Sequence, residues 1–308
     1  MELLYLLEKI RMPELDEFML AITTLGEEMA LLVIALILFW CVDKRHGYYI
    51  LSVGFLGTIA NQFMKLLFKV PRPWVKDPNF TIVEKAREGA GGFSFPSGHT
   101  QSAVGLLGGV AKVTRKKLLA FICVVGAVLV GFSRMYLGVH TPWDVLVGAA
   151  QSILLLMIIH PLVYKNDGKL IPVLLGGMIV IAAAFLWYVE NANFGGMVVD
   201  GVVNENVESG IKNAYTLLGC TVGLMIVWIA DRKLNFNTNA VWWAQLLKVG
   251  LGLLVVLAVK EGLRVPLELI CGGHMIARAI RYCLIVVVAG IVWPLTFRYF
   301  PKNTKVIT

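Results

Sequence analysis

The stretch LLAFICVVGAVLVGFSRMYLG, residues 118–138, decides what kind of fold this chain adopts. It is almost unbroken in its apolar character and has about the twenty residues that an α-helix needs to cross a bilayer. Similar runs recur throughout: 58% of the residues are hydrophobic, the mean hydropathy is +0.75 and only 16% are charged, against about a quarter in soluble domains. Because backbone groups in lipid must pair within their own segment, the sequence predicts an all-α, polytopic transmembrane helical bundle.

Nine candidate spans follow from the apolar runs. They cover residues 27–42, 48–68, 100–113, 118–138, 143–164, 170–189, 214–230, 244–263 and 279–300. The third is short, so we expect it to begin in the headgroup region or to tilt within the bundle. The chain then divides into an amphipathic interfacial segment (1–26), a six-span core (27–190) and an extension of about three C-terminal spans (191–308).

The basic residues gather in alternate gaps between the spans. The gaps after spans one, three, five and seven read DKRHG, AKVTRKK, YKNDGK and DRKLNFN. The positive-inside rule therefore predicts an integral protein of the plasma or inner membrane, with these gaps and the C-terminus in the cytoplasm and the N-terminus outside. The gap 69–99 is an exception, since it is basic although it falls on the outer side. Loop placement accounts for the net charge of +8, so nucleic acid is not an expected partner.

The cysteines do not indicate a redox or metal function. Most of the five fall within apolar runs and none belongs to a CxxC pair. They are Cys41, Cys123, Cys220, Cys271 and Cys283. The sequence thus predicts no disulfide framework, no metal cluster and no cofactor.

Three polar stretches fall on the predicted outer side. They are KLLFKVPRP with Lys65 and Arg72, PSGH at 96–99, and SRMYLGVHTPWD at 133–144 with Arg134. Lysine and arginine side chains at three such positions suit a phosphate group, which guanidinium groups bind with two hydrogen bonds at once. Ser97 and Gly98 open a predicted helix, whose free N–H groups and positive dipole end attract anions. Together the stretches predict a phosphate-binding site at one membrane face.

Two histidines and a carboxylate complete this constellation. Thr141-Pro142-Trp143-Asp144 is typical of a helix start and places Asp144 about one turn beyond His140. Asp144 is expected to accept the Nδ1 proton of His140, which leaves Nε2 free to attack phosphorus. His99, beside the predicted anion-binding helix start, is then positioned to protonate the leaving oxygen.

The combined pattern Lys-x6-Arg-Pro, Pro-Ser-Gly-His and Ser-Arg-x5-His-x3-Asp resembles the type 2 phosphatidic acid phosphatase superfamily, whose members include glucose-6-phosphatase, bacterial acid phosphatases and vanadium haloperoxidases. All three motifs are complete between Lys65 and Asp144, and the resemblance covers the six-helix phosphatase core but not the region beyond residue 189. It implies metal-independent phosphate ester hydrolysis through a phosphohistidine. The implied nucleophile is His140, oriented by Asp144, with His99 as general acid. The implied phosphate-binding residues are Lys65, Arg72, Ser97, Gly98 and Arg134.

Two further groups of polar residues are candidate headgroup contacts. Glu27 and Glu28 open the first span, where helix capping is the simpler explanation. His274, Arg278 and Arg281 have the spacing of one helix face, where interfacial anchoring is the simpler explanation.

The function predicted from the sequence is hydrolysis of a lipid phosphate monoester or diphosphate at the extracytoplasmic face, with the membrane lipid entering sideways from the outer leaflet. Phosphatidic acid, phosphatidylglycerol phosphate, a polyprenyl diphosphate and a sphingoid phosphate all suit this chemistry. The alternatives are hydrolysis of a soluble phosphate ester, phosphotransfer to a lipid or sugar hydroxyl, and a catalytically silent lipid-binding protein. The sequence does not indicate an oligomeric state.

Overall fold

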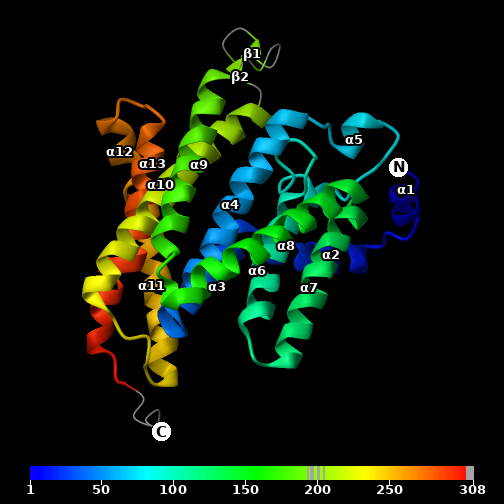
Figure 1. The fold of residues 1–308 in the computed structure, drawn as a ribbon. Helices are drawn as coiled ribbons and strands as arrows, with labels where there is room; N and C mark the ends of the chain where they lie inside the picture. The colour runs from blue at the N-terminus through cyan, green and yellow to red at the C-terminus, as the bar shows by residue number, and fades with distance from the viewer. Residues whose placement is uncertain (193, 195–197, 200–201, 204, 303–308) are drawn as a thin grey trace.

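The computed structural model confirms the polytopic all-α bundle and describes residues 1–192, 194, 198–199, 202–203 and 205–302. The predicted core contains six long helices that pack around one another (Figure 1). They are α3 (Glu28–Cys41), α4 (Lys44–Phe68), α6 (Gly98–Val113), α7 (Lys117–Tyr136), α8 (Pro142–Tyr164) and α9 (Ile171–Asn191). Three short elements link them: η2 (Glu84–Ala86) and α5 (Pro73–Lys76) before α6, and η3 (Lys165–Gly168) before α9.

Helices α4, α6 and α8 approach one another closely because glycines face their neighbours. A Cβ on Gly109 of α6 would lie 2.3 Å from the Cδ1 of Ile50 in α4, and one on Gly105 would lie 3.2 Å from the Val53 side chain. Small residues at such crossings allow the close backbone approach that drives helix association in lipid. The packing fixes the end of α4 beside the start of α6, which is where two of the three polar stretches lie.

A helix stands at each of the nine predicted spans, but not all are long enough to cross a membrane alone. Among the described residues seven helices have the length and hydropathy of a span. The first predicted span, α3, has only 14 residues, and it continues from α2 (Pro13–Thr23) and η1 (Thr24–Gly26) through a 52° bend. The third, α6, has 16 residues, in line with its predicted shortness.

The first 26 residues pack against the core. Helix α1 (Glu2–Lys9) buries Leu4 and Leu7, while Leu3 and Leu6 are exposed. Arg11 then donates to the carbonyl oxygen of Tyr136 at the end of α7, at 2.9 Å. Because α2 also packs along α7, this segment lies beside the turn that carries His140.

The C-terminal part packs against the opposite side of the core, on α3, α4 and α9 (Figure 1). It comprises α10 (Glu205–Leu234), α11 (Trp242–Gly262), α12 (Arg264–Ile270), α13 (Ile276–Val287), η5 (Val288–Val292) and η6 (Pro294–Tyr299). A two-residue hairpin, β1 (Val198–Val199) with β2 (Val202–Val203), precedes α10. The indole N–H of Trp40 in α3 donates to the carbonyl oxygen of Ala289, at 2.9 Å, and so joins core to extension.

Three of the predicted cytoplasmic gaps meet at the end of the bundle remote from the polar stretches. They surround a cavity of about 720 Å³, whose wall includes Asp43, Lys169 and Asn235. Lys44 and Asp231 form an ion pair of 2.6 Å beside it. The loops after α3, α8 and α10 therefore lie on one side, as alternation of the spans requires.

Candidate active site

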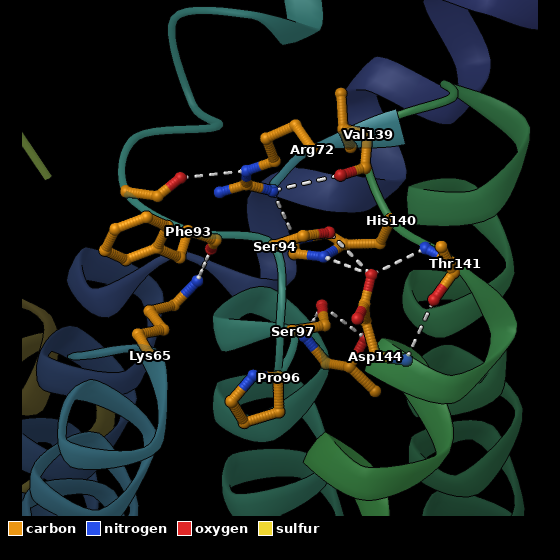
Figure 2. A network of polar contacts seen from close by, with 12 residues as sticks. Lys65, Arg72, Phe93, Ser94, Pro96, Ser97, Val139, His140, Thr141 and Asp144 are labelled. Carbon is orange, nitrogen blue, oxygen red and sulfur yellow. Dashed lines mark hydrogen bonds and ion pairs between the residues drawn. The ribbon is translucent and has the colours of Figure 1, made fainter. Parts of the chain in front are cut away.

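Three buried cations converge at the end of the bundle where α4 and α7 finish. Lys65 lies in the last turn of α4, Arg72 caps α5 and Arg134 lies in the last turn of α7, and each is at most 6% exposed. Lys65 Nζ donates to the carbonyl oxygen of Phe93 (Figure 2). Arg72 donates to the carbonyl oxygens of Gly91 and Gly92, at 2.7 and 3.0 Å. Backbone carbonyls thus orient the cations without neutralising them.

Arg134 has donors that the protein leaves free. Its Nη1 donates to the Oγ1 of Thr23, at 2.9 Å, whereas its Nε and Nη2 have no hydrogen-bond partner in the part of the chain that the structure describes. The side chain is 1% exposed, and buried donors are rarely left unpaired. Two adjacent guanidinium donors suit a phosphate oxygen pair.

The PSGH stretch forms the predicted helix start. Ser97 is the N-cap of α6, and its Oγ accepts from the backbone N–H of Thr100. The Ser97 N–H donates to the backbone oxygen of Asp144, at 2.9 Å, and a Cβ on Gly148 would lie only 2.6 Å from the Ser97 oxygen. Helix α8 therefore packs directly against this turn. The Ser97 hydroxyl serves the cap, while Gly98 and His99 reach the cavity described below.

His140 and Asp144 face each other across the start of α8, although Nδ1 of His140 has no hydrogen-bond partner among the described residues. The side chain of Thr141 accepts from the Asp144 N–H and the Asp144 Oδ2 accepts from the Thr141 N–H, which is the reciprocal capping expected from the sequence. His140 Nδ1 lies 3.5 Å from the same Oδ2. The Ser94 hydroxyl also donates to it, at 2.6 Å (Figure 2). The Asp144 carboxylate that faces the imidazole is therefore held by two donors, the Ser94 hydroxyl and the Thr141 N–H.

The protonation of His140 follows from its other neighbour. Arg72 Nη1 lies 2.9 Å from His140 Nε2, and a guanidinium can only donate, so Nε2 carries the lone pair and Nδ1 carries the proton towards Asp144. Burial and the charges of Arg72, Arg134 and Lys65 lower the pKa of His140 well below its usual range. A neutral imidazole with its lone pair on Nε2 is the form that a nucleophile needs.

The two histidines share one cavity of about 340 Å³. Its wall includes the predicted site residues Glu27, Glu28, Lys65, Arg72, Gly98, His99 and His140. A phosphate ester in this space would have a neutral nucleophile, cations and a second imidazole within one enclosure. That arrangement suits displacement at phosphorus with protonation of the leaving oxygen.

The other predicted headgroup residues are not on this wall. Arg278 Nε donates to the Oγ1 of Thr216, at 2.7 Å, which joins α13 to α10. The His274 ring packs edge-on against Tyr215, and the Arg281 guanidinium lies 5.5 Å from the centre of the Tyr282 ring. Glu28 is brought within electrostatic range of Arg278, without forming an ion pair.

Several residues at the site were not predicted from the sequence, and three of them lie against predicted ones. Ser94 fixes Asp144, Thr23 holds Arg134, and a Cβ on Gly26 would lie 2.6 Å from the backbone oxygen of His99. Ser94 lies three residues before Ser97, and its proximity to the PSGH motif was the available signal. Thr23 and Gly26 precede the first predicted span and carry no motif.

Comparison with known proteins agrees with this geometry. Residues 45–167 match the PAP2 superfamily, and residues 214–305 match the PAP2 superfamily phosphatase, transmembrane extension. The chain belongs to the PAP2 superfamily. The resemblance predicted from the motifs is thereby confirmed, but its predicted limit at residue 189 was wrong, because the C-terminal spans also match this superfamily.

Several proteins named as phosphatases are similar to the chain. Undecaprenyl-diphosphatase BcrC of Bacillus subtilis is 32% identical over 143 residues, which are 46% of this chain and 71% of the relative. Phosphatidylglycerophosphatase B of the same organism is 34% identical over 163 residues, or 49% and 76% of the two chains. The probable sphingosine-1-phosphate phosphatase of Dictyostelium discoideum is 30% identical over 200 residues, or 59% and 48%. No solved structure matches the chain.

Proposed function

We propose that this PAP2-superfamily chain is a lipid phosphatase that hydrolyses a lipid phosphate monoester or diphosphate through a phosphohistidine, at the extracytoplasmic face and without a metal ion. The observation that carries the proposal is the pair of contacts on His140: Arg72 donates to Nε2 at 2.9 Å, and Asp144 faces Nδ1 at 3.5 Å. The lipid phosphatases named above support the substrate class.

In the first step the substrate phosphate replaces the hydrogen bond between Arg72 and His140. The Nε2 lone pair forms a bond to phosphorus as the bond from phosphorus to the ester oxygen breaks. Asp144 stabilises the positive charge that develops on the imidazole. Burial and the charges of Arg134, Arg72 and Lys65 lower the pKa of the free His99 to about 3, and the negative charge of a bound phosphate dianion raises it. His99 therefore takes up its proton together with the phosphate and gives it to the leaving oxygen.

In the second step water cleaves the phosphohistidine. Neutral His99 takes a proton from the water, whose oxygen attacks phosphorus while the bond to Nε2 breaks. Inorganic phosphate is released, and both histidines return to their first protonation states. Lys65, Arg72 and Arg134 stabilise the equatorial oxygens in both steps, which is the charge-stabilising role that metal ions have in many phosphoryl-transfer enzymes.

The distribution of charge supports an extracytoplasmic site. The basic gaps 43–47, 112–117, 165–169 and 231–237 lie between spans that alternate in direction, away from His99 and His140. Three basic residues of the gap 69–99 have roles that do not depend on the positive-inside rule. Arg72 contributes to the site, Lys85 pairs with Glu17 at 2.5 Å, and Arg87 pairs with Glu84 at 2.8 Å. A lipid would enter sideways from the outer leaflet.

The test is phosphate release by the purified protein in EDTA, from lipid phosphates and soluble esters, with His140→Ala and the matched variant His160→Ala. His160 lies within α8, stacked against Tyr164, and is expected to be dispensable. We expect release from a lipid by the wild type and His160→Ala only, and an acid-labile phosphoryl group on trapped wild-type protein. Added detergent micelles should slow hydrolysis of a lipid by surface dilution.

Three results would contradict the proposal. Hydrolysis by folded His140→Ala excludes the nucleophile, loss of activity in EDTA that returns with a divalent ion excludes metal independence, and release from soluble esters alone excludes a lipid substrate. Labelling of His99 and His140 side chains only from the cytoplasmic side of sealed vesicles would exclude the predicted face.

A further inference from the structure

We propose that the site selects a phosphate monoester that carries a cationic amine on the carbon next to the ester-bearing carbon, as in an amino-alcohol phosphate. This inference rests on the proposed function, and narrows it. The observation behind it is that the cavity wall beyond the phosphate cations is polar and acidic. Its side chains there include Glu27, Glu28, Asn61, Gln62, Gln101 and Ser102.

These side chains lie where the substrate carbons next to the phosphate must pass. In α4, Asn61 precedes Lys65 by four residues and so lies about 6 Å further into the bundle. In α6, Gln101 and Ser102 lie beyond His99 in the same direction. A lipid with its phosphate on Lys65 and Arg72 extends its next carbons inward, along this wall. Met29 is the only apolar side chain on the wall within the described residues.

Two buried polar atoms on this wall have no hydrogen-bond partner among the described residues. Asn61 Oδ1 and Gln101 Nε2 belong to side chains that are 1% exposed, yet neither atom has a hydrogen-bond partner in the described part of the chain. Asn61 Nδ2 does donate, to the oxygen of Pro96 at 3.4 Å, which assigns Oδ1 as the free acceptor. Buried polar atoms are usually paired, so these atoms indicate a polar ligand group.

The two carboxylates define the charge of that group. Glu27 and Glu28 are exposed on the cavity wall, and their carboxylates form no ion pair or hydrogen bond within the described ranges. Glu27 lies within electrostatic range of Arg134, and Glu28 within that of Arg278, but neither cation neutralises its carboxylate directly. An ammonium close to the phosphate would meet both carboxylates, whereas the second phosphate of a diphosphate would be repelled by them.

A matched series of lipid phosphates tests this inference. The series has one chain length and carries hydrogen, hydroxyl or amine at the second carbon, with sphinganine 1-phosphate as the natural amine and its N-acetyl derivative as the uncharged form. We expect kcat/KM for the amine to exceed that for the plain alkyl phosphate by about tenfold or more, the usual value of one charge-assisted hydrogen bond. A polyprenyl diphosphate should be the poorest substrate.

Carboxylate variants locate the effect. Glu27→Gln and Glu28→Gln should lower the ratio of kcat/KM for the amine to that for the alkyl phosphate, by about tenfold in the double variant. Glu14→Gln, an exposed carboxylate of α2 off the cavity wall, should leave the ratio unchanged. Equal turnover of all members by the wild type, or an unchanged ratio in the double variant, would overturn the inference.

The proposed function can fail separately from this inference. If His140→Ala hydrolyses the alkyl phosphate as fast as the wild type, the phosphatase assignment fails. If His140→Ala is inactive but a polyprenyl diphosphate is preferred over the amine, the phosphatase assignment stands and the amine selection is wrong. A preference for the hydroxyl that both glutamine variants retain would also contradict a cationic ligand.

Discussion

The two ends of the chain relate to the active site in opposite ways. The N-terminal segment lies outside the residues that match the superfamily, yet the Thr23 side chain forms no cap hydrogen bond and instead accepts from Arg134, and Gly26 lies against His99. The C-terminal extension matches a superfamily segment of its own, yet none of its described residues is on the cavity wall. The residues that match a family model therefore need not include every residue that contacts the candidate site.

The N-terminal segment and the C-terminal extension differ because they cover different faces of the core. Residues 1–26 pack along α7, whose last turn supplies Arg134, and on the loop before α6. The extension packs on α3, α4 and α9, and a Cβ on Gly210 of α10 would lie 2.8 Å from the Cδ1 of Leu66 in α4. We infer that the first part completes the phosphate site and that the second supports the bundle.

The largest effect is expected from Gly26→Ala. The new Cβ would lie 2.6 Å from the His99 backbone oxygen, so α6 must move, and a shift of about 1 Å in a catalytic group can lower the rate about 100-fold. The measurement is kcat at saturating lipid, with thermal unfolding to confirm the fold. The matched control is Gly250→Ala in α11, where the Cβ meets nothing within 4 Å. If both variants have wild-type activity, the N-terminal segment does not position His99.

A smaller loss is expected from Thr23→Val, which keeps the side-chain shape and removes the acceptor for Arg134. One hydrogen bond to a charged group corresponds to a loss of about tenfold in kcat/KM, together with weaker inhibition by vanadate. Thr23→Ser should restore most of it. Thr24→Val is the control, because the Thr24 hydroxyl bonds only to the Ala21 oxygen of its own helix. Equal losses in the two valine variants would show a general helix defect.

A still smaller change, about threefold or less, is expected from Arg278→Gln in the extension. Its guanidinium donates to Thr216 and is not on the cavity wall. Its charge acts on the wall residue Glu28 without an ion pair, and such charge pairs contribute little. The measurement is kcat/KM for the same lipid as above. A loss of tenfold or more would mean that the extension takes part in headgroup binding, and the contrast between the two ends would no longer hold.

The smallest expected effect concerns pH. Burial and nearby cations lower the pKa of His140, so the imidazole becomes protonated only at a pH below its ordinary pKa of about 6.5. The fall of kcat/KM on the acid side (its acid limb) should therefore lie below that pH. Removing a cation raises this pKa, so Arg134→Gln should move the limb to higher pH. Thr23→Val keeps the charge and should leave the limb in place. A shift of the limb in Thr23→Val would mean that Thr23 does more than hold Arg134.

The local features of the site could be predicted because they depend on neighbours in sequence. The N-cap at Ser97, the reciprocal cap of Thr141 with Asp144 and the relation of His140 to Asp144 all involve residues at most four positions apart. Periodicity and capping preferences report on that range. The nine helices were found for the same reason, since each apolar run is local.

Other features depend on contacts over long separations. Ser94 meets Asp144 across 50 positions and Thr23 meets Arg134 across 111, and a single hydroxyl carries no periodic signal. Glu27 and Glu28 interrupt the apolar pattern, and the boundary between the predicted interfacial segment and the core was placed there. In the structure this position is the bend between α2 and α3. The last predicted span contains a π-helical segment and a 3₁₀ segment that starts at Pro294, where proline removes a helix donor.

The hydrogen bond from Arg72 to His140 affects how readily chemical reagents modify this histidine. A histidine whose lone pair already accepts a hydrogen bond from a guanidinium is a poor target for electrophiles, such as acylating reagents that modify free imidazoles. A bound anion that accepts a hydrogen bond from Arg72 in place of His140 would free the Nε2 lone pair. A phosphate ester would do so when its phosphorus atom lies beside Nε2. Inorganic phosphate or vanadate should therefore change the rate at which such reagents modify His140, the proposed nucleophile, and modification kinetics would show whether the contact with Arg72 protects it.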